Sequence, residues 1–253
     1  ADAAGHWTHL DTPTGAFRTY FISLDPLHPD TIFAGTSDGL IKSVNRGAAW
    51  RKVSTHAVKS IAFDRFVPGR IFFASTDAGL LLSTDDGNTL RESNFGFARG
   101  TFTRLSRAGE ALYLSVQSDL YRSDTFGLRW QNMGAGPGGG RVLVVSAAPD
   151  APRSVFAAGY HGLYQSLDGG KTWQTRRGVP EGARIKALLP QAKGVLLAGT
   201  DQGIFRSSSA AAFNRVAPGT VDSIQSTGPR GTPEVLGRKK ENSQTFSQEH
   251  LSF

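Results

Sequence analysis

Basic side chains recur where the first strand of a repeated unit is expected, and such side chains could bind an anion. The aligned positions hold Arg18, Lys59, Thr103, Arg141, Lys186 and Asp222, so four of the six are basic. Equivalent positions on equivalent strands face the same side. Positive charges that converge in a space of low dielectric attract anions strongly. We therefore predict a site for an anion or an acidic peptide. The alternative is that these side chains reach the rim and are simply solvated.

Other candidates for this surface lie nearby in the sequence. Arg184, with Arg176 and Arg177, would add positive charge to the same rim. His161 stands in Gly159-Tyr-His-Gly162, where the other repeats carry an Asp-type turn, and this departure suggests a binding position.

The sequence predicts no metal site and no cofactor. Cysteine is absent, which excludes disulfides and cysteine-ligated zinc or iron–sulfur centres. His6 and His9 are the only close pair of histidines, and on a strand residues three apart point to opposite faces. The glycine-rich segment 134–140 lacks the Lys-Ser/Thr of a phosphate-binding loop, so we interpret it as a flexible connection.

Carboxylates are the remaining candidates for catalysis. Aspartates recur just before or at the start of the expected third strands, at Asp38, Asp77, Asp119 and Asp201. Glycoside hydrolysis needs two carboxyl groups roughly 5–10 Å apart, and a shared loop level could bring two of these together. The alternative, which we favour, is that they form turns in positions where aspartate is preferred.

Composition limits the kinds of protein that these residues can serve. Apolar residues make up 39% of 253, glycine counts 30, and no apolar run approaches the roughly 20 residues that span a membrane. The net charge is 28 − 21 = +7, which favours acidic partners. Aromatic residues fall mainly on expected strands, where the core needs them, so we predict no nucleic-acid binding.

An internal repeat determines how these residues are positioned. Five segments share one pattern, Gly39-Leu-Ile-Lys-Ser43 being the first, and their serines lie 40, 40, 43 and 41 residues apart. Each period holds four short apolar runs; in the second these are 58–64, 70–75, 80–83 and 90–93. Four strands per period of about 40–45 residues indicate a β-propeller blade.

Six periods account for the chain, so we predict a single all-β domain, a six-bladed β-propeller with four-stranded blades. The blades span about 15–54, 55–95, 100–133, 139–177, 183–216 and 219–253. The last period lacks a fourth strand, and residues 6–10 resemble a fourth strand without a blade. We expect this N-terminal strand to complete the last blade and close the ring, which removes exposed sheet edges.

A second motif follows the repeated serine. Its clearest copy is Ser166-Leu-Asp168-Gly-Gly170-Lys-Thr172-Trp173, and the second repeat keeps all of it except the aromatic residue. The copies in the first and third repeats are degenerate, and the fifth has lost both Asp and Gly. The predicted structural positions are Ser43, Asn45, Gly47, Trp50, Ser83, Asp85, Gly87, Ser123, Gly127, Trp130, Ser166, Asp168, Gly170 and Trp173.

This motif resembles the Asp-box of bacterial neuraminidase repeats. We expect the Asp to accept hydrogen bonds from N–H groups of its own turn, the Gly to supply a positive φ, and the Trp to pack between neighbouring units. A catalytic or metal-binding role for these aspartates is the less favoured alternative.

The repeat is found in sialidases, xyloglucanases, sortilin-type receptors and photosystem II assembly factors, and the short layout looks most like the assembly factors. That resemblance implies a non-catalytic scaffold outside the cytoplasm that binds a protein or peptide. We expect a monomer, and the basic positions predict an acidic partner. The alternative is a sialidase-like glycoside hydrolase or a glycan-binding lectin. A sialidase would use three arginines, for which Arg18, Arg141 and Arg184 are available, but the family's Arg-Ile-Pro motif is absent.

Overall fold

The computed structural model describes residues 18–64, 67–75, 78–93, 102–108, 110–148, 150–180, 182–207, 213–227, 232–238 and 246–249. The predicted strand 6–10, with His6 and His9, lies outside these residues, as does Asp77. The chain divides into two compact units, Ala1–Leu105 and Ser106–Phe253, which we describe separately.

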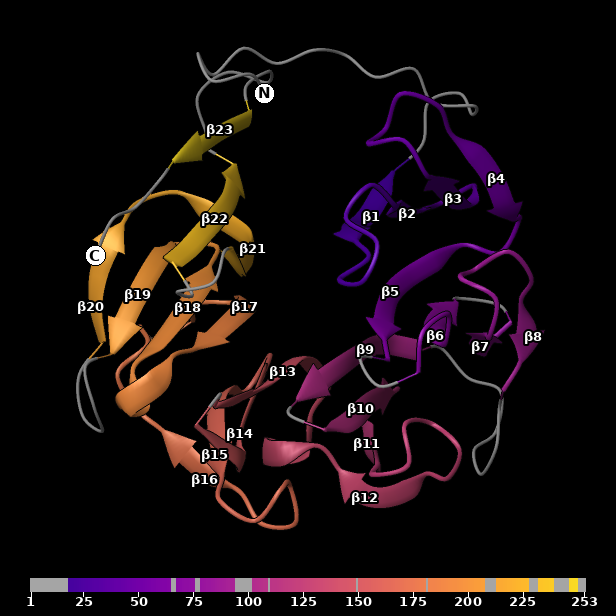
Figure 1. Cartoon of the computed structure of the whole chain (residues 1–253). Helices are drawn as coiled ribbons and strands as arrows, with labels where there is room; N and C mark the ends of the chain where they lie inside the picture. Colours follow the sequence, from indigo (N-terminus) through magenta and orange to yellow (C-terminus); the bar gives the residue numbers. More distant parts are fainter. Residues whose placement is uncertain are drawn as a thin grey trace. The chain divides into compact units, whose positions relative to one another are not determined.

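The first unit contains two four-stranded sheets (Figure 1). The strands follow chain order in each sheet: β1 (Thr19–Leu24), β2 (Ile32–Thr36), β3 (Gly39–Ser43) and β4 (Arg51–Ser54), then β5 (Val58–Phe63), β6 (Ile71–Ser75), β7 (Leu80–Ser83) and β8 (Arg91–Glu92). The four strands predicted for the second repeat are thus confirmed.

The second unit continues the pattern. The division between the units falls within β9 (Phe102–Ala108), which pairs with β10 (Ala111–Val116) in a sheet with β11 (Asp119–Ser123) and β12 (Gln131–Ala135). The next two sheets are β13 (Val142–Ala148), β14 (Ala151–Gly159), β15 (Gly162–Ser166) and β16 (Gln174–Arg176), then β17 (Ile185–Pro190), β18 (Leu196–Thr200), β19 (Gly203–Ser207) and β20 (Phe213–Ala217).

A last sheet contains three described strands, β21 (Thr220–Thr227), β22 (Thr232–Arg238) and β23 (Phe246–Glu249). Helical structure among the described residues amounts to two 3₁₀ turns, η1 (Pro137–Gly139) and η2 (Ala192–Gly194). The predicted all-β class is therefore confirmed. No helix of the described residues is long and apolar enough to cross a bilayer.

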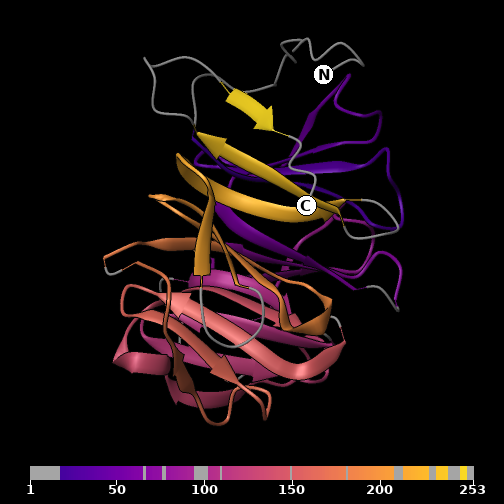
Figure 2. The ribbon, with the colours of Figure 1, turned by 90° about the vertical axis from the view of Figure 1, so that its left-hand side faces the viewer.

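Hydrophobic clusters form between consecutive sheets rather than within one. In the first unit Phe33 and Leu40 pack with Val58, Ile71 and Phe73 of the next sheet. In the second unit β13 contacts β17, β17 contacts β21, and Figure 2 shows its twisted sheets lying face to face. In a β-propeller the first strands of consecutive blades neighbour one another, and the hydrophobic core lies between the blades. The sheets of each unit show this arrangement.

A cation–aromatic pair on each of two sheets holds the turn of the following sheet. In the first unit the Lys42 Nζ lies 5.5 Å from the Phe33 ring centroid and donates to the Asp86 carbonyl oxygen at 2.6 Å. Phe33 packs under this turn so closely that a Cβ on Gly87 would lie 2.6 Å from its Cε1. The aromatic residue and the cation come from paired positions of the second and third strands.

The second unit repeats this contact with different side chains. The Arg122 guanidinium lies 6.0 Å from the Tyr113 ring centroid and donates to the Gly169 carbonyl oxygen at 2.7 Å. The Tyr113 hydroxyl donates to the same oxygen at 2.8 Å, and burial raises the pKa of that hydroxyl. We call these two arrangements the inter-sheet clamps, Phe33–Lys42 and Tyr113–Arg122.

The Tyr113–Arg122 clamp predicts that substitutions of its two hydrogen-bond donors have non-additive effects on the free energy of unfolding. Tyr113→Phe should lower the free energy of unfolding by about 1 kcal/mol, because Arg122 still satisfies the Gly169 carbonyl. Tyr113→Phe combined with Arg122→Met should cost more than the sum of the single variants by at least about 0.5 kcal/mol, because the carbonyl then loses both donors. Denaturant unfolding of the four proteins measures this difference.

The control for this cycle is Tyr121→Phe, a hydroxyl deletion on the same sheet that leaves the Gly169 carbonyl untouched. We expect it to change stability by no more than about 0.5 kcal/mol. Strictly additive losses at Tyr113 and Arg122 would contradict the clamp.

Candidate functional site

The aspartates of the repeated motif are engaged by their own turns. Asp168 Oδ1 accepts hydrogen bonds from Ser166 Oγ (2.7 Å) and from the N–H groups of Lys171 and Thr172 (both 2.9 Å). Its Oδ2 accepts from Thr172 Oγ1 at 2.6 Å. Such contacts make the carboxylate part of the turn and leave little of it available for catalysis.

Asp85 repeats this geometry. Its Oδ1 accepts from Ser83 Oγ (2.8 Å), Asn88 N (3.1 Å) and Thr89 N (2.9 Å), and its Oδ2 accepts from Thr89 Oγ1 (2.7 Å). The hydrogen bonds from Thr89, with that from Ser83, lower the pKa of Asp85 from 3.8 to about 2. The corresponding hydrogen bonds from Thr172 and Ser166 also lower the pKa of Asp168.

The degenerate copies keep the turn with weaker acceptors. Asn45 Oδ1 accepts from Ser43 Oγ (2.9 Å) and Ala49 N (2.8 Å), while Thr125 Oγ1 accepts from Arg129 N (2.9 Å). In every described copy the serine hydroxyl accepts from the glycine N–H, and the glycine φ is positive. The glycines are Gly47 (φ 88°), Gly87 (75°), Gly127 (81°) and Gly170 (92°).

The aromatic end of the motif packs against a hydrophobic cluster in the fourth repeat. Trp173 packs against the cluster of Tyr113 and Val155, which joins two consecutive sheets. Leu90 takes the corresponding place in the second repeat, against the cluster that contains Phe33. Trp50 and Trp130 are half-buried at the equivalent positions.

The other candidate carboxylates include two with structural partners. Asp38 Oδ2 accepts from Lys52 Nζ at 2.9 Å, and Asp201 Oδ1 accepts from the Arg184 N–H at 2.9 Å. Asp119 is half-buried at the start of β11. These contacts favour the role in turns and strand ends over the role in catalysis.

Strand register divides the candidate basic residues into two levels. Arg18, Arg141 and Arg184 directly precede the first paired residue of β1, β13 and β17, namely Thr19, Val142 and Ile185. Lys59 and Lys186 fall one residue after the first pair, at the irregularity in the register that β5 and β17 share with β1 and β13. A β-bulge there inserts one residue and re-aims its side chain. The alignment of Arg18 and Arg141 with the two lysines is corrected accordingly.

In the first unit these positions bring a lysine to an aromatic ring. Lys59 Nζ lies 6.0 Å from the Tyr20 ring centroid, and Tyr20 occupies the equivalent bulge position of β1. Arg18 is exposed, and its N–H donates to Ser37 Oγ at 3.0 Å.

In the second unit Arg141, His161 and Arg184 lie around one aromatic residue. The Arg184 guanidinium carbon is 5.8 Å from the ring centroid of Tyr160, whose surface is 55% exposed. The neighbouring His161 packs against Gly140, where a Cβ would overlap with the imidazole. The backbone of Arg141 lies against Gly159 in the same way. We call Arg141, Tyr160, His161 and Arg184 the Tyr160 surface; all four residues are exposed.

The glycine-rich segment supports this surface. It is the predicted connection between two sheets, and its turn η1 packs against the β14–β15 turn. A Cβ on Gly138 would overlap with the Tyr164 hydroxyl, which itself donates to the His161 carbonyl oxygen at 2.9 Å. Thr103 and Asp222, the remaining aligned positions, have no described side chains.

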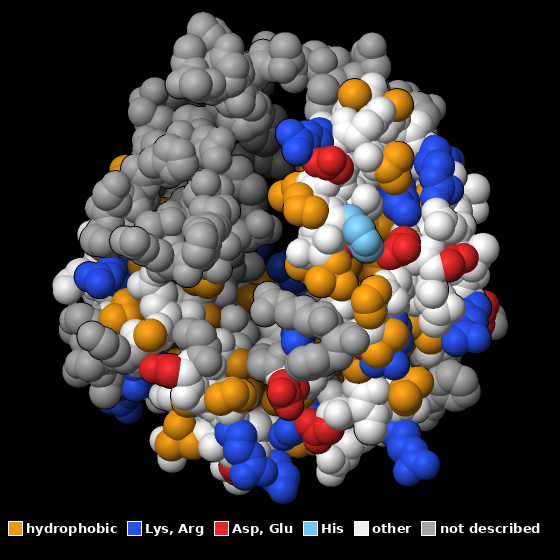
Figure 3. Space-filling model, viewed as in Figure 1, with side chains coloured by type: hydrophobic (Ala, Val, Ile, Leu, Met, Phe, Trp, Pro, Cys, Tyr) orange, Lys and Arg blue, Asp and Glu red, His pale blue; other side chains and the backbone are white. Residues whose placement is uncertain are grey.

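Charge is mixed on the described surface. Figure 3 shows basic and acidic side chains interspersed on the described parts of both units, with no large area of one sign in that view. An anion would therefore be recognised by particular side chains rather than by a broad area of positive electrostatic potential.

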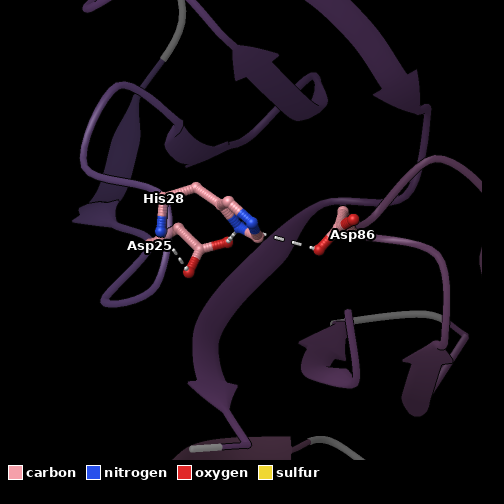
Figure 4. Close-up of side chains that lie close together, drawn as sticks. All are labelled: Asp25, His28 and Asp86. Carbon is pink, nitrogen blue, oxygen red and sulfur yellow. Dashed lines mark hydrogen bonds and ion pairs between the residues drawn. The ribbon is translucent and has the colours of Figure 1, made fainter. Parts of the chain in front are cut away.

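A histidine–carboxylate cluster, which the sequence did not suggest, lies in the first unit (Figure 4). His28 Nδ1 is 3.2 Å from Asp25 Oδ2 and 3.9 Å from Asp86 Oδ1. Asp25 is buried, and its Oδ1 accepts from the N–H groups of Leu27 and His28. These three side chains could offer ligand atoms to a cation. They also connect the β1–β2 loop to the turn that Lys42 holds.

Comparison with known proteins identifies the fold. No protein-family model and no curated protein sequence matches the chain. Among solved structures, it is similar to an ancestral GH74 enzyme (TM-score 0.71, 18% identity, 95% of this chain and 37% of that one). It is also similar to the extracellular domain of a putative hybrid two-component system from B. thetaiotaomicron (0.73, 11%, 97% and 35%).

A third similar structure is YCF48 bound to D1 peptide (TM-score 0.69, 11% identity, 92% of this chain and 80% of that one). The chain spans well under half the length of the GH74 enzyme and of the two-component receptor domain. At these identities the similarities establish a β-propeller fold.

The hydrogen bonds of Asp85 within its turn predict how the stability of the protein depends on pH. Asp85→Asn should lower the thermal midpoint at neutral pH, because the amide is a weaker acceptor, although Asn45 shows that it fits the turn. The folded-state pKa of Asp85, about 2, lies below its ordinary 3.8. The carboxylate's contribution to stability is therefore complete above the ordinary value and is lost as the pH falls through about 2. The difference between the two proteins should accordingly shrink across this interval.

Thermal unfolding followed by circular dichroism at a series of pH values measures this difference. Glu110→Gln, at an exposed position before β10, is the control and should track the wild type throughout. A difference for Asp85→Asn that is constant with pH would contradict the assignment.

Proposed function

We propose that this chain is a non-catalytic β-propeller scaffold that binds an acidic peptide or protein segment. The observation that carries the proposal is the Tyr160 surface. There an exposed ring lies beside the Arg184 guanidinium, with Arg141 and His161 at its margin. Tyrosine and arginine are the residues most enriched at energetically important positions of protein interfaces. Arginine also binds carboxylates through paired, charge-assisted hydrogen bonds.

The comparisons support a peptide partner and a place outside the cytoplasm. One similar propeller, YCF48, was solved bound to D1 peptide, and another is an extracellular domain. By analogy with the first we propose a role like that of an assembly factor, and by analogy with the second an extracytoplasmic location.

Glycoside hydrolysis is the second candidate, and the similarity to a GH74 enzyme favours it. It requires two carboxyl groups on opposite sides of a bound sugar. Incubation with xyloglucan, β-glucosides and sialosides at acidic to neutral pH tests it. Turnover that Arg141→Ala removes would replace the scaffold proposal with the enzyme.

We further propose that the propeller has six blades and that the N-terminal segment supplies the fourth strand of the last one. The last sheet has three described strands where the others have four. Ile22 of β1 corresponds in register to Val145 and Leu188, which each pack in the core shared with the preceding sheet.

The peptide proposal predicts that charge reversal abolishes binding without unfolding. Arg141→Glu combined with Arg184→Glu should weaken capture of an acidic, aromatic-containing synthetic peptide at least about tenfold, since about 1.4 kcal/mol is lost. Fluorescence anisotropy at fixed salt measures the affinities.

Arg129→Glu is the control, because it makes the same charge reversal at one position, on a turn between third and fourth strands. It should leave the affinity within about twofold of the wild type, as expected for a charge outside the interface. Equal affinity of the Arg141/Arg184 variant and the wild type, with both proteins folded, would remove the Tyr160 surface from the proposal.

Closure by the N-terminal strand predicts a cost for its removal. Deletion of residues 1–12 should lower the thermal midpoint by at least about 4 °C, because the last sheet would lose a strand and expose an edge. Deletion of residues 1–5, which leaves 6–10 in place, is the control. If both deletions leave the midpoint unchanged, the strand does not complete the blade.

A further inference from the structure

One arginine of the second unit occupies a position that is apolar in two other sheets and is a serine, Ser93, in the second repeat. Arg176 is the third residue after Trp173, as Val53 is after Trp50 and Met133 after Trp130. Val53 and Met133 both pack against hydrophobic clusters between sheets. Arg176 is half-buried, and its Nε is buried without a hydrogen-bond partner. A buried donor of this kind is costly unless something accepts its hydrogen bond.

The arginine lines a cavity of about 390 Å³. The polar residues around it are Asp150, Ser154, Gln165, Arg176 and Gln191, and Phe156 contributes an apolar wall. These residues come from β14, β15, β16 and the loop that precedes β14, and from the loop after β17 in the next sheet. The cavity thus lies between two consecutive sheets of one unit, and its volume is at the lower end of small-molecule sites.

The departure from the repeat extends to the neighbours of Arg176. Phe156 pairs with Gln165 in the register in which Phe33 pairs with Lys42, and Tyr113 with Arg122. Gln165 therefore stands at the position of the clamp cation, as Leu82 does in the second sheet, and its amide donates to Ser154 Oγ at 3.0 Å. The turn that a clamp would hold here belongs to the fifth copy of the motif, which has lost both Asp and Gly.

We propose that this cavity binds a small organic monocarboxylate, a function separate from peptide binding at the Tyr160 surface. The carboxylate would accept from the unpartnered Arg176 Nε–H and from a second guanidinium N–H, the paired geometry that arginine favours. Gln165, Gln191 and Ser154 offer further hydrogen bonds, and Phe156 with Val195 would contact an apolar body. The Asp150 carboxylate on the lining disfavours a second negative charge, which argues against a phosphate or a dicarboxylate.

Phenylacetate is a suitable probe, and phenylacetamide is its neutral counterpart of nearly the same shape. Arginine Nε–H signals in the ¹⁵N-labelled full chain report on the site, and the Arg176 signal is the one that disappears in Arg176→Met. We expect phenylacetate to shift this signal in a saturable way and phenylacetamide to bind at least about tenfold more weakly, since the charged pairing is lost.

Arg176→Met should bind phenylacetate at least about tenfold more weakly and remain folded, because Met133 is native at the equivalent position. Its thermal midpoint without ligand should equal or exceed that of the wild type, because a buried, unpaired donor is removed. Arg177→Met, at the exposed neighbouring position, should bind like the wild type.

Three results would overturn the proposal: no saturable shift with phenylacetate, equal binding of phenylacetamide, or unchanged binding by Arg176→Met. None of them bears on the Arg141/Arg184 variant, whose peptide affinity is measured separately. Failure of this inference is therefore distinguishable from failure of the proposed function.

Discussion

The propeller depends on backbone carbonyl groups that must be satisfied between sheets. A sheet can pair its own strands internally, but a turn that enters the space between two sheets carries polar groups away from water. The inter-sheet clamps meet this demand with a lysine or arginine that donates to the turn while an aromatic ring covers it. Burial, and then the charge of Arg51, lowers the pKa of Lys42, which shows the electrostatic cost of placing the donor there.

The clamp works only because the turn itself is rigid. Asp85 and Asp168 bind the N–H groups and hydroxyls of their own turns, and a residue with positive φ precedes each glycine. The carbonyl that the clamp binds therefore belongs to a turn that is held by its own hydrogen bonds. Two polar contacts of different range, one within the turn and one between sheets, thus act on the same few residues.

The sequence predicted those features that repeat, and it could not predict those that depend on register or on single departures. The period and the turn residues predicted the strands and the four-stranded sheets. A bulge leaves no mark in an apolar pattern, so Arg18 and Lys59 were aligned although they lie at two levels. The clamp cations had a visible signal, a basic residue before the repeated serine at Lys42 and Arg122. The contact of His28 with Asp25 had none, because a loop brings them together.

Residues that differ from the repeat are informative, because the residue types that recur at equivalent positions indicate what packing requires there. Val53 and Met133, for example, keep an apolar side chain at one equivalent position of the cores between sheets. At one inter-sheet space two departures coincide: Gln165 in place of a clamp cation and Arg176 in place of an apolar residue. Each alone would weaken the interface. Sequences that break local rules usually do so where function requires it, and two such side chains on one cavity point to a ligand that supplies the missing contacts.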